Sequence, residues 1–371
     1  MAQPTIPLFK VFMPGSAHAA LKPVLESGQL ATGPQVRAFE SQLAAWFGHP
    51  QVTALSDASA ALTLALYQTG VRPGDEVITS PLACSATLMP IANLFARPVW
   101  CDIDPLTGMI DAGKIDALVS EKTRAILVYH WSGDVADIAA IAAVARKHDL
   151  KLVEDASEAF GAEYKNRRLG GESDFTIYSF YATKHINCSE GAALLTRNAA
   201  DVEVSRRLRR FGIDYSSLRQ PNGNLNPRFD IPVAGFNFPM NEIAATLGIE
   251  GLHHADQIVA KHRANGSFYE SALADVPGMR LLKRREDSVS GYWTYALLAE
   301  RRDDLMRKLV VAGIGTQRLH LRNDAYSCFG GKSMNLPWVA TFDAQNLSIP
   351  CGWWVGEEER DYIVKCIRAG W

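Results

Sequence analysis

Short apolar runs alternate with helical segments between about residue 50 and residue 200, and this alternation is the strongest constraint on the fold. The runs have the length of strands and are bounded by turn residues. They cover Val52–Leu55, Glu76–Thr79, Pro98–Cys101, Ala125–Tyr129, Lys151–Glu154, Phe175–Tyr178 and Ala192–Thr196. Between them, apolar residues recur at helical spacing, as in residues 58–67 and 138–147. This pattern predicts an α/β fold in which a mostly parallel sheet is flanked by helices.

The rest of the chain predicts a second, smaller domain. A chain of 371 residues is long enough for one large domain and a smaller one. Residues 217–235 are polar and rich in Asn, Pro and Gly, which predicts a loop. A long helical stretch from Asn241 to Leu273 follows. We therefore expect a large domain over residues 1–250 and a smaller C-terminal α+β domain over residues 251–371.

Composition and charge argue against several classes of protein. The formal net charge of −2 gives no electrostatic reason to bind nucleic acid or an anionic membrane. The first residues lack the features of a signal peptide, and no apolar stretch approaches the ~20 residues of a membrane span. The six cysteines form no Cys-x-x-Cys pair, which is typical of reduced thiols rather than of a metal site. We expect a cytoplasmic protein without a metal.

One lysine stands near the sheet edge where open α/β folds bind their ligands. Lys184 follows the predicted strand after the short run Tyr181-Ala-Thr. A lysine of ordinary pKa is protonated and a poor nucleophile at neutral pH, and a Schiff base to an aldehyde cofactor solves this problem. Ser179, on the same strand, can bind a phosphate oxygen through its hydroxyl. A lone lysine after a strand is usually a surface residue, but these neighbours favour the Schiff-base role.

A carboxylate at the end of another strand supplies the second group that pyridoxal phosphate (PLP) needs. An ionised Asp155 would keep the ring nitrogen of PLP protonated, so that the ring withdraws electrons. The alternative is that Asp155 caps a following helix, because Asp155-Ala-Ser-Glu158 resembles a capping box. Glu158 could be the partner in that cap or could contact the ring hydroxyl of PLP. The combination with Lys184 favours the cofactor role for Asp155.

Small residues at the start of the next helical segment predict a phosphate site. Ala58 and Ser59 follow the strand that ends at Leu55. Small side chains let backbone N–H groups approach an anion, and the helix dipole favours negative charge there. A plain helix cap is the alternative interpretation. Asp57 fits beside a phosphate only if its side chain points away or caps the helix locally.

These elements, in this order and spacing, resemble the DegT/DnrJ/EryC1/StrS family of sugar aminotransferases, which belong to the fold-type I (aspartate aminotransferase-like) PLP enzymes. The resemblance covers nearly the whole chain. It is carried by residues 27–40, 73–78, 153–161, the run around Lys184 and residues 235–242.

The resemblance implies roles for the residues around the cofactor ring. Lys184 would form the imine with PLP, and Asp155 would bind the pyridine nitrogen. Glu158 falls where the family often has Gln or another polar group near a PLP oxygen. Cys84 would lie on the ring, where the family usually has an aromatic residue. A thiol still packs against an aromatic face, but it covers less area.

The resemblance also implies binding residues and a partner subunit. The phosphate would be held by Ala58, Ser59 and Ser179. Asn237 would reach the phosphate of the neighbouring subunit, which implies a homodimer with active sites at the interface. His320 and Arg322 belong to a segment similar to a His-bearing loop that lines the sugar site in several members of the family.

The implied reaction is transfer of an amino group, by family expectation from glutamate, to a keto group of a nucleotide-linked deoxysugar. The Ser-Glu-Gly run after Lys184 favours the sugar C4. Two alternatives remain. Some relatives are PLP-dependent 3-dehydratases of 4-keto sugars, but they have His in place of the lysine, whereas Lys184 is intact. A PLP-binding regulator without turnover is the other alternative, and the lack of a basic DNA-binding segment argues against it.

Overall fold

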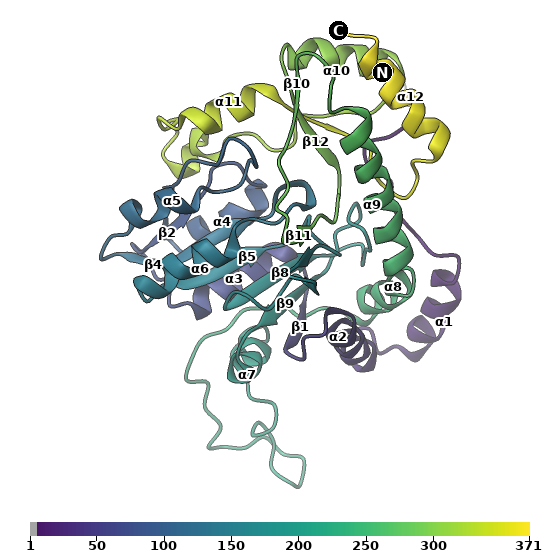
Figure 1. Cartoon of the computed structure of the whole chain (residues 1–371). Coiled ribbons are helices and arrows are strands. Elements are labelled where there is room, and N and C mark those ends of the chain that lie inside the picture. The colour runs from purple at the N-terminus through teal and green to yellow at the C-terminus, as the bar shows by residue number, and fades with distance from the viewer. Residues whose placement is uncertain (1–5) are drawn as a thin grey trace.

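The computed structural model describes residues 6–371, and a seven-stranded sheet forms its centre (Figure 1). The strand order is β1-β9-β8-β5-β4-β2-β3. These strands are β1 (Val52–Leu55), β2 (Glu76–Thr79), β3 (Arg97–Trp100), β4 (Thr123–Tyr129), β5 (Lys151–Asp155), β8 (Phe175–Ser179) and β9 (Ala192–Thr196). Only β9 runs antiparallel to its neighbours β1 and β8. The predicted α/β fold with a mostly parallel sheet is confirmed, and the predicted strands are found with small shifts at some ends.

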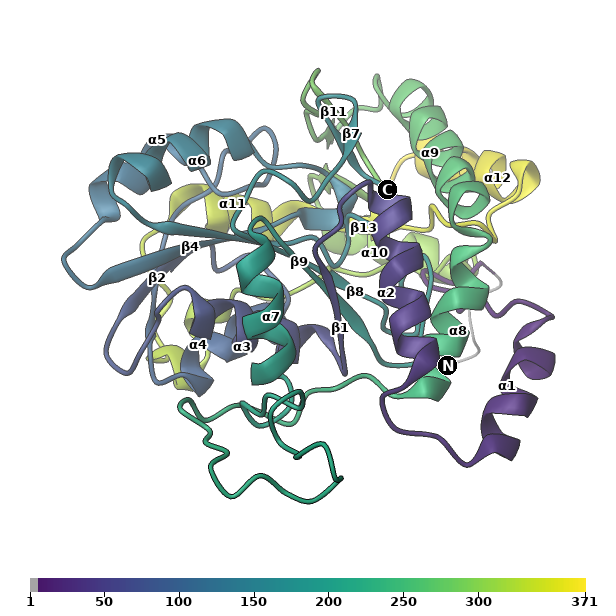
Figure 2. The same ribbon diagram turned by 90° about the horizontal axis from the view of Figure 1, so that it is seen from below.

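Helices pack on both sides of this sheet. Those of the first 252 residues are α1 (Ala17–Ser27), α2 (Pro34–Phe47), α3 (Ala58–Gln68), α4 (Ser85–Asn93), α5 (Ala112–Ile115), α6 (Ile138–Lys147), α7 (Ala199–Leu208) and α8 (Glu242–Leu252). Figure 2 shows α5 and α6 on one side of β2 and β4, with α3 and α4 on the other. Helix α3 contacts β5, β8 and β9, and it is apolar around most of its circumference because it is buried. Because α3 begins three residues after the end of β1, its N-terminus lies at the edge of the sheet where β1 ends.

A second, three-stranded sheet forms the centre of the C-terminal region. Its strands lie in the order β10 (Met279–Leu281), β12 (Tyr295–Ala299) and β13 (Asn346–Ile349). The helices of this region are α9 (Ala255–Ala272), α10 (Arg302–Val311), α11 (Pro337–Gln345) and α12 (Glu357–Arg368). The short strands β6 (Glu163–Tyr164), β7 (Arg167–Arg168) and β11 (Ser288–Val289) form a third sheet that joins the two regions.

The stretch predicted as one long helix from Asn241 to Leu273 is two helices, α8 and α9, because the chain leaves the helix at His253 and His254. The domain boundary predicted near residue 250 falls beside this interruption and stays a prediction. The N-terminal end of the described chain crosses to the C-terminal region, as Figure 1 shows. There Ile6 pairs with Ile314 and is buried in the same apolar cluster.

The polar segment predicted as a loop, residues 217–235, contains neither helix nor strand. It extends away from α7 in Figures 1 and 2. Within residues 6–371, none of the helices combines the length and the apolar character that crossing a membrane requires.

The segment after β5 is a turn rather than a helix, so the interpretation of Asp155 and Glu158 as a capping box is wrong. The turn closes at Gly161, whose φ is +78°, in the left-handed region that favours glycine. A Cβ on Gly161 would lie 2.4 Å from a methyl carbon of Val259 on α9. Parallel pairing places Tyr129, the last residue of β4, beside Asp155, the last residue of β5.

Candidate active site

Lys184 lies in a tight turn after β8 and packs on an aromatic ring. Its backbone N–H donates to the carbonyl of Tyr181 at 2.9 Å. Its Nζ lies 3.6 Å from the centre of the Trp293 ring. Trp293 is held in place from two directions: its Nε1 donates to the carbonyl of Thr183 at 2.9 Å, and Phe9 stacks on it with ring centres 4.7 Å apart. The side chain of Lys184 therefore has a fixed support.

Burial lowers the pKa of Lys184 below its ordinary value, because the charged ammonium form loses hydration. The nearby acidic groups of Glu158, Cys84 and Asp155 act in the opposite direction without cancelling this effect. A lowered pKa increases the share of the neutral amine, which is the form that attacks an aldehyde. Lys184, Asp155, Glu158 and Cys84, which are four of the predicted site residues, therefore lie close to one another.

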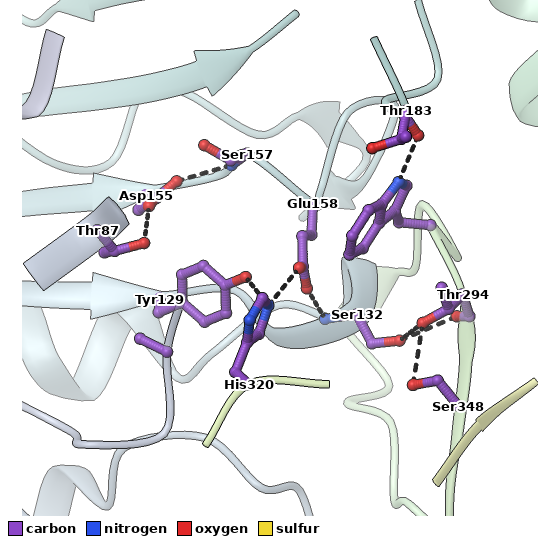
Figure 3. A network of polar contacts seen from close by, with 12 residues as sticks. Thr87, Tyr129, Ser132, Asp155, Ser157, Glu158, Thr183, Thr294, His320 and Ser348 are labelled. Carbon is purple, nitrogen blue, oxygen red and sulfur yellow. Dashed lines mark hydrogen bonds and ion pairs between the residues drawn. The ribbon is translucent and has the colours of Figure 1, made fainter. Parts of the chain in front are cut away.

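Asp155 is buried, with 1% of its surface exposed, and both of its carboxylate oxygens accept a hydrogen bond (Figure 3). Oδ2 accepts from the hydroxyl of Thr87 at 2.6 Å, and Oδ1 accepts from the backbone N–H of Ser157 at 2.9 Å. Thr87 belongs to α4, so this helix fixes the orientation of the carboxylate. Each oxygen keeps one further acceptor position, which leaves room for a ring N–H.

Glu158 is buried at the centre of a second polar network (Figure 3). Its Oε2 accepts from the backbone N–H of Ser132 at 2.7 Å, and its Oε1 lies 2.9 Å from Nε2 of His320. Burial alone would raise the pKa of Glu158. The hydrogen bond and charge of His320, together with the charge of Lys184, outweigh burial and hold this pKa below its ordinary value.

His320 connects the C-terminal region to the large sheet. Its Nε2 also lies 3.0 Å from the hydroxyl of Tyr129, and its ring meets the Trp131 ring edge-on with centres 5.4 Å apart. The backbone of His320 has a φ of +48°, an unusual conformation for a residue with a Cβ. Burial raises the pKa of Tyr129 well above its ordinary value, so this hydroxyl stays protonated at neutral pH.

The small residues at the start of α3 line a cavity of about 590 Å³. Ala58, Ser59 and Ser179 all face it, as predicted for a phosphate site. Asp57 caps α3, because its Oδ1 accepts from the backbone N–H of Ala60 at 2.8 Å. Its carboxylate is therefore committed to the helix, which resolves the difficulty of an acid beside a phosphate.

Two of the predicted residues lie elsewhere, and one lies at the edge of the site. Asn237 is exposed and is not among the residues that line this cavity; its backbone bridges to Arg210. Arg322 donates to Asp324 and to the carbonyl of Met334, the latter at 2.9 Å. Cys84 directly precedes α4 and is half-buried, and burial raises the pKa of its thiol.

Sequence reasoning missed four residues that hold the predicted ones in place: Thr87, Tyr129, Ser132 and Trp293. A signal was present only for Tyr129, because it ends a strand beside the strand that ends at Asp155. Ser132 acts through its backbone, which no residue type reveals. Trp293 lies 109 residues beyond Lys184, so only the folded chain brings them together.

The residues present fit PLP. A lysine amine of lowered pKa suits the aldehyde, and a buried carboxylate with free acceptor positions suits the protonated ring nitrogen. The start of α3 offers small side chains and a helix N-terminus to the phosphate. Within residues 6–371, no group of three or more His, Cys, Asp or Glu is arranged to hold a metal ion.

Fold and site together define a PLP-dependent aminotransferase of fold type I. Over residues 15–368 the chain matches the DegT/DnrJ/EryC1/StrS aminotransferase family, and it belongs to this family. The predictions of family, fold class, enzyme class and cofactor are thereby confirmed.

Three similar proteins illustrate the relationship. The spore coat polysaccharide biosynthesis protein SpsC of Bacillus subtilis (strain 168) is 31% identical over 355 residues, which are 93% of this chain and 91% of that protein. The crystal structure of the sugar aminotransferase CalS13 from Micromonospora echinospora matches with a TM-score of 0.94 at 33% identity, over 99% of this chain and 100% of that one. AtS13 from Actinomadura melliaura matches with a TM-score of 0.94 at 32% identity, over 100% of both chains.

Proposed function

We propose that the protein transfers an amino group from glutamate to the keto carbon, C4 being favoured, of a nucleotide-linked deoxysugar. Membership of a sugar aminotransferase family supports the reaction class, and the similarity to SpsC supports a role in making a polysaccharide precursor. The observation that carries the proposal is the Lys184 amine of lowered pKa, supported by Trp293 and facing Asp155 and Glu158.

PLP, when bound, supplies a ring that withdraws electrons and so weakens the C–H bond beside the amino group being moved. Asp155, oriented by Thr87 and Ser157, would keep the ring nitrogen protonated. The Nζ of Lys184 would take a proton from the substrate carbon as general base and deliver it to the cofactor carbon as general acid. Burial favours its neutral form, which is the form that a general base needs.

Glu158 and His320 would form the part of the site that faces the ring hydroxyl of PLP. The carboxylate accepts from Ser132 and His320, so it cannot rotate freely toward a ligand. His320 would thus position Glu158 near the ring hydroxyl, with Tyr129 fixing the imidazole. Cys84 would pack on the ring. The intact Lys184 argues against the dehydratase alternative, because that reaction belongs to relatives that lack the lysine.

The proposal includes a homodimer and a cytoplasmic location. Asn237 is exposed on a segment next to the phosphate cavity, and this position supports a contact with the site of a neighbouring subunit. The free thiols of the six cysteines support a reducing compartment. The sugar-binding roles proposed for His320 and Arg322 would require their present contacts with Glu158 and Asp324 to be shared with the substrate.

The variant Lys184→Ala tests the proposal. It should lose the absorbance band of the imine and lose turnover, whereas Lys122→Ala, which alters an exposed lysine, should keep both. Retained turnover in Lys184→Ala would refute the mechanism. The product mass separates the alternatives, because an aminotransferase product gains an amine, a dehydratase product loses an oxygen, and a regulator makes neither.

A further inference from the structure

A basic cavity lies beside the phosphate cavity, and the side chains that line it take no part in the contacts described above. It has a volume of about 390 Å³ and is lined by Arg37 of α2, by Arg206, Arg209 and Arg210 at the end of α7, and by Tyr215 and Pro239. Helices α2 and α7 both pack on β1, and Figure 2 shows their place beside that strand. The residues after Pro239 line the phosphate cavity, so one short segment separates the two cavities.

Two of the four arginines are already neutralised by carboxylates of the chain. Nη1 of Arg209 lies 2.6 Å from Oε1 of Glu40, a carboxylate whose side chain is 8% exposed. Arg206 contacts Glu203 at 2.7 Å and Glu40 at 3.8 Å. These pairs fix the end of α7 and hold the wall of the cavity in place.

The other two arginines, Arg37 and Arg210, form no ion pair within the described residues 6–371. The Nε of Arg210 donates to the hydroxyl of Tyr215 at 3.0 Å, and this contact leaves both terminal nitrogens free to donate. Four guanidinium groups against two carboxylates leave the cavity with two uncompensated positive charges. Arginine forks match phosphate oxygens in geometry as well as in charge.

We propose that this cavity binds the diphosphate group of a nucleotide-linked substrate, with Arg37 and Arg210 as its ligands. The inference rests on the proposed function and names the part of the substrate that this cavity takes. A sugar nucleotide carries two negative charges on its diphosphate, which equals the charge that the cavity leaves uncompensated. The sugar end of such a substrate would then lie toward the neighbouring phosphate cavity, where the cofactor is expected.

Calorimetric titration of the PLP-loaded protein tests the inference. The probes are UDP, dTDP and orthophosphate, because a free phosphate presents the same chemistry as a diphosphate. The variants are Arg37→Gln, Arg210→Gln and the double variant. Arg207→Gln is the matched control. It removes the same charge at the end of α7, three residues before Arg210, but Arg207 does not line the cavity and pairs with Asp214 at 3.1 Å.

Each single variant should lower the affinity for the better nucleotide by about 10-fold or more, the usual effect of losing a hydrogen bond to a charged group, and the double variant by more. The control should bind like the native protein. Unchanged nucleotide affinity in the double variant would overturn the inference. Orthophosphate that binds as tightly as the nucleotides and is not displaced by them would also overturn it, as would a double variant that dissociates into monomers.

A separate measurement keeps this inference distinct from the proposed function. Glutamate alone should abolish the imine band of the native protein and of the double variant equally, because the amino donor needs no nucleotide site. If glutamate leaves the band of the native protein unchanged, the proposed function fails. If glutamate abolishes the band and the arginine variants bind nucleotide normally, only the basic cavity has been assigned wrongly.

Discussion

Lowering the pH from 7 to 5 should destabilise the protein through two buried histidines next to the reactive lysine. His185 and His262 are each 1% exposed, and their ring centres lie 4.5 Å apart. Nε2 of His185 donates to the carbonyl of Gly291 at 2.8 Å, and Nδ1 of His262 donates to that of Tyr292 at 2.7 Å. The other nitrogen of each ring has no partner within residues 6–371, so no acceptor awaits a second proton.

Burial lowers the pKa of His262 from 6.5 to about 4, and burial together with the neighbouring imidazole lowers the pKa of His185 well below its ordinary value. Because these values lie below those of the unfolded chain, the unfolded state binds more protons as the pH falls. The stabilisation is complete above about pH 6.5 and is lost as the pH falls toward 4. For His262 alone, the free energy of unfolding should fall by about 2 kcal/mol between pH 7 and pH 5.

Urea unfolding followed by tryptophan fluorescence at pH 7 and pH 5 measures this loss. His262→Asn keeps a donor for the carbonyl of Tyr292 but cannot titrate, so its loss between the two pH values should be about 2 kcal/mol smaller than that of the native protein. His253→Asn, at an exposed position, should behave like the native protein. Equal losses in the native protein and in His262→Asn would refute the reasoning, whatever the absolute stabilities.

Three further variants test other contacts. Thr87→Val removes one of the two hydrogen bonds to buried Asp155, so it should lower the free energy of unfolding by about 1–3 kcal/mol and weaken PLP binding in a fluorescence titration. Unchanged stability and PLP affinity would show that Thr87 does not orient the carboxylate. His320→Ala leaves one oxygen of the buried Glu158 without its hydrogen bond and should cost about 1–3 kcal/mol in urea unfolding, part of which Glu158→Gln should restore in the double variant. Gly161→Ala should cost more than Gly223→Ala in urea unfolding, by about 1–3 kcal/mol, because both have positive φ but only the first added Cβ meets Val259.

The sequence predicted the sheet and the positions of Asp155 and Lys184, because strand ends in a parallel sheet collect at one edge and apolar runs mark those strands. Small residues at a helix start have a local signature, and Ala58 and Ser59 do line a cavity, while their role in binding phosphate stays a prediction. The sequence did not predict that Glu158 contacts His320, 162 residues away, since no local pattern records such a pairing. The capping-box interpretation of Asp155 failed because Gly161 closes a turn where a helix was considered.

The contact between Phe9 and Trp293 makes the segment from Ile6 to Phe9 a support of the candidate active site. Phe9 stacks on the Trp293 ring, over which the Nζ of Lys184 lies. Ile6, in the same segment, pairs with the C-terminal region. An enzyme shortened by ten residues would retain every side chain proposed to act on the cofactor, yet the indole beneath the amine would lose one of its two supports. Expression tags and truncations at this end should therefore be chosen with the mobility of the lysine in mind.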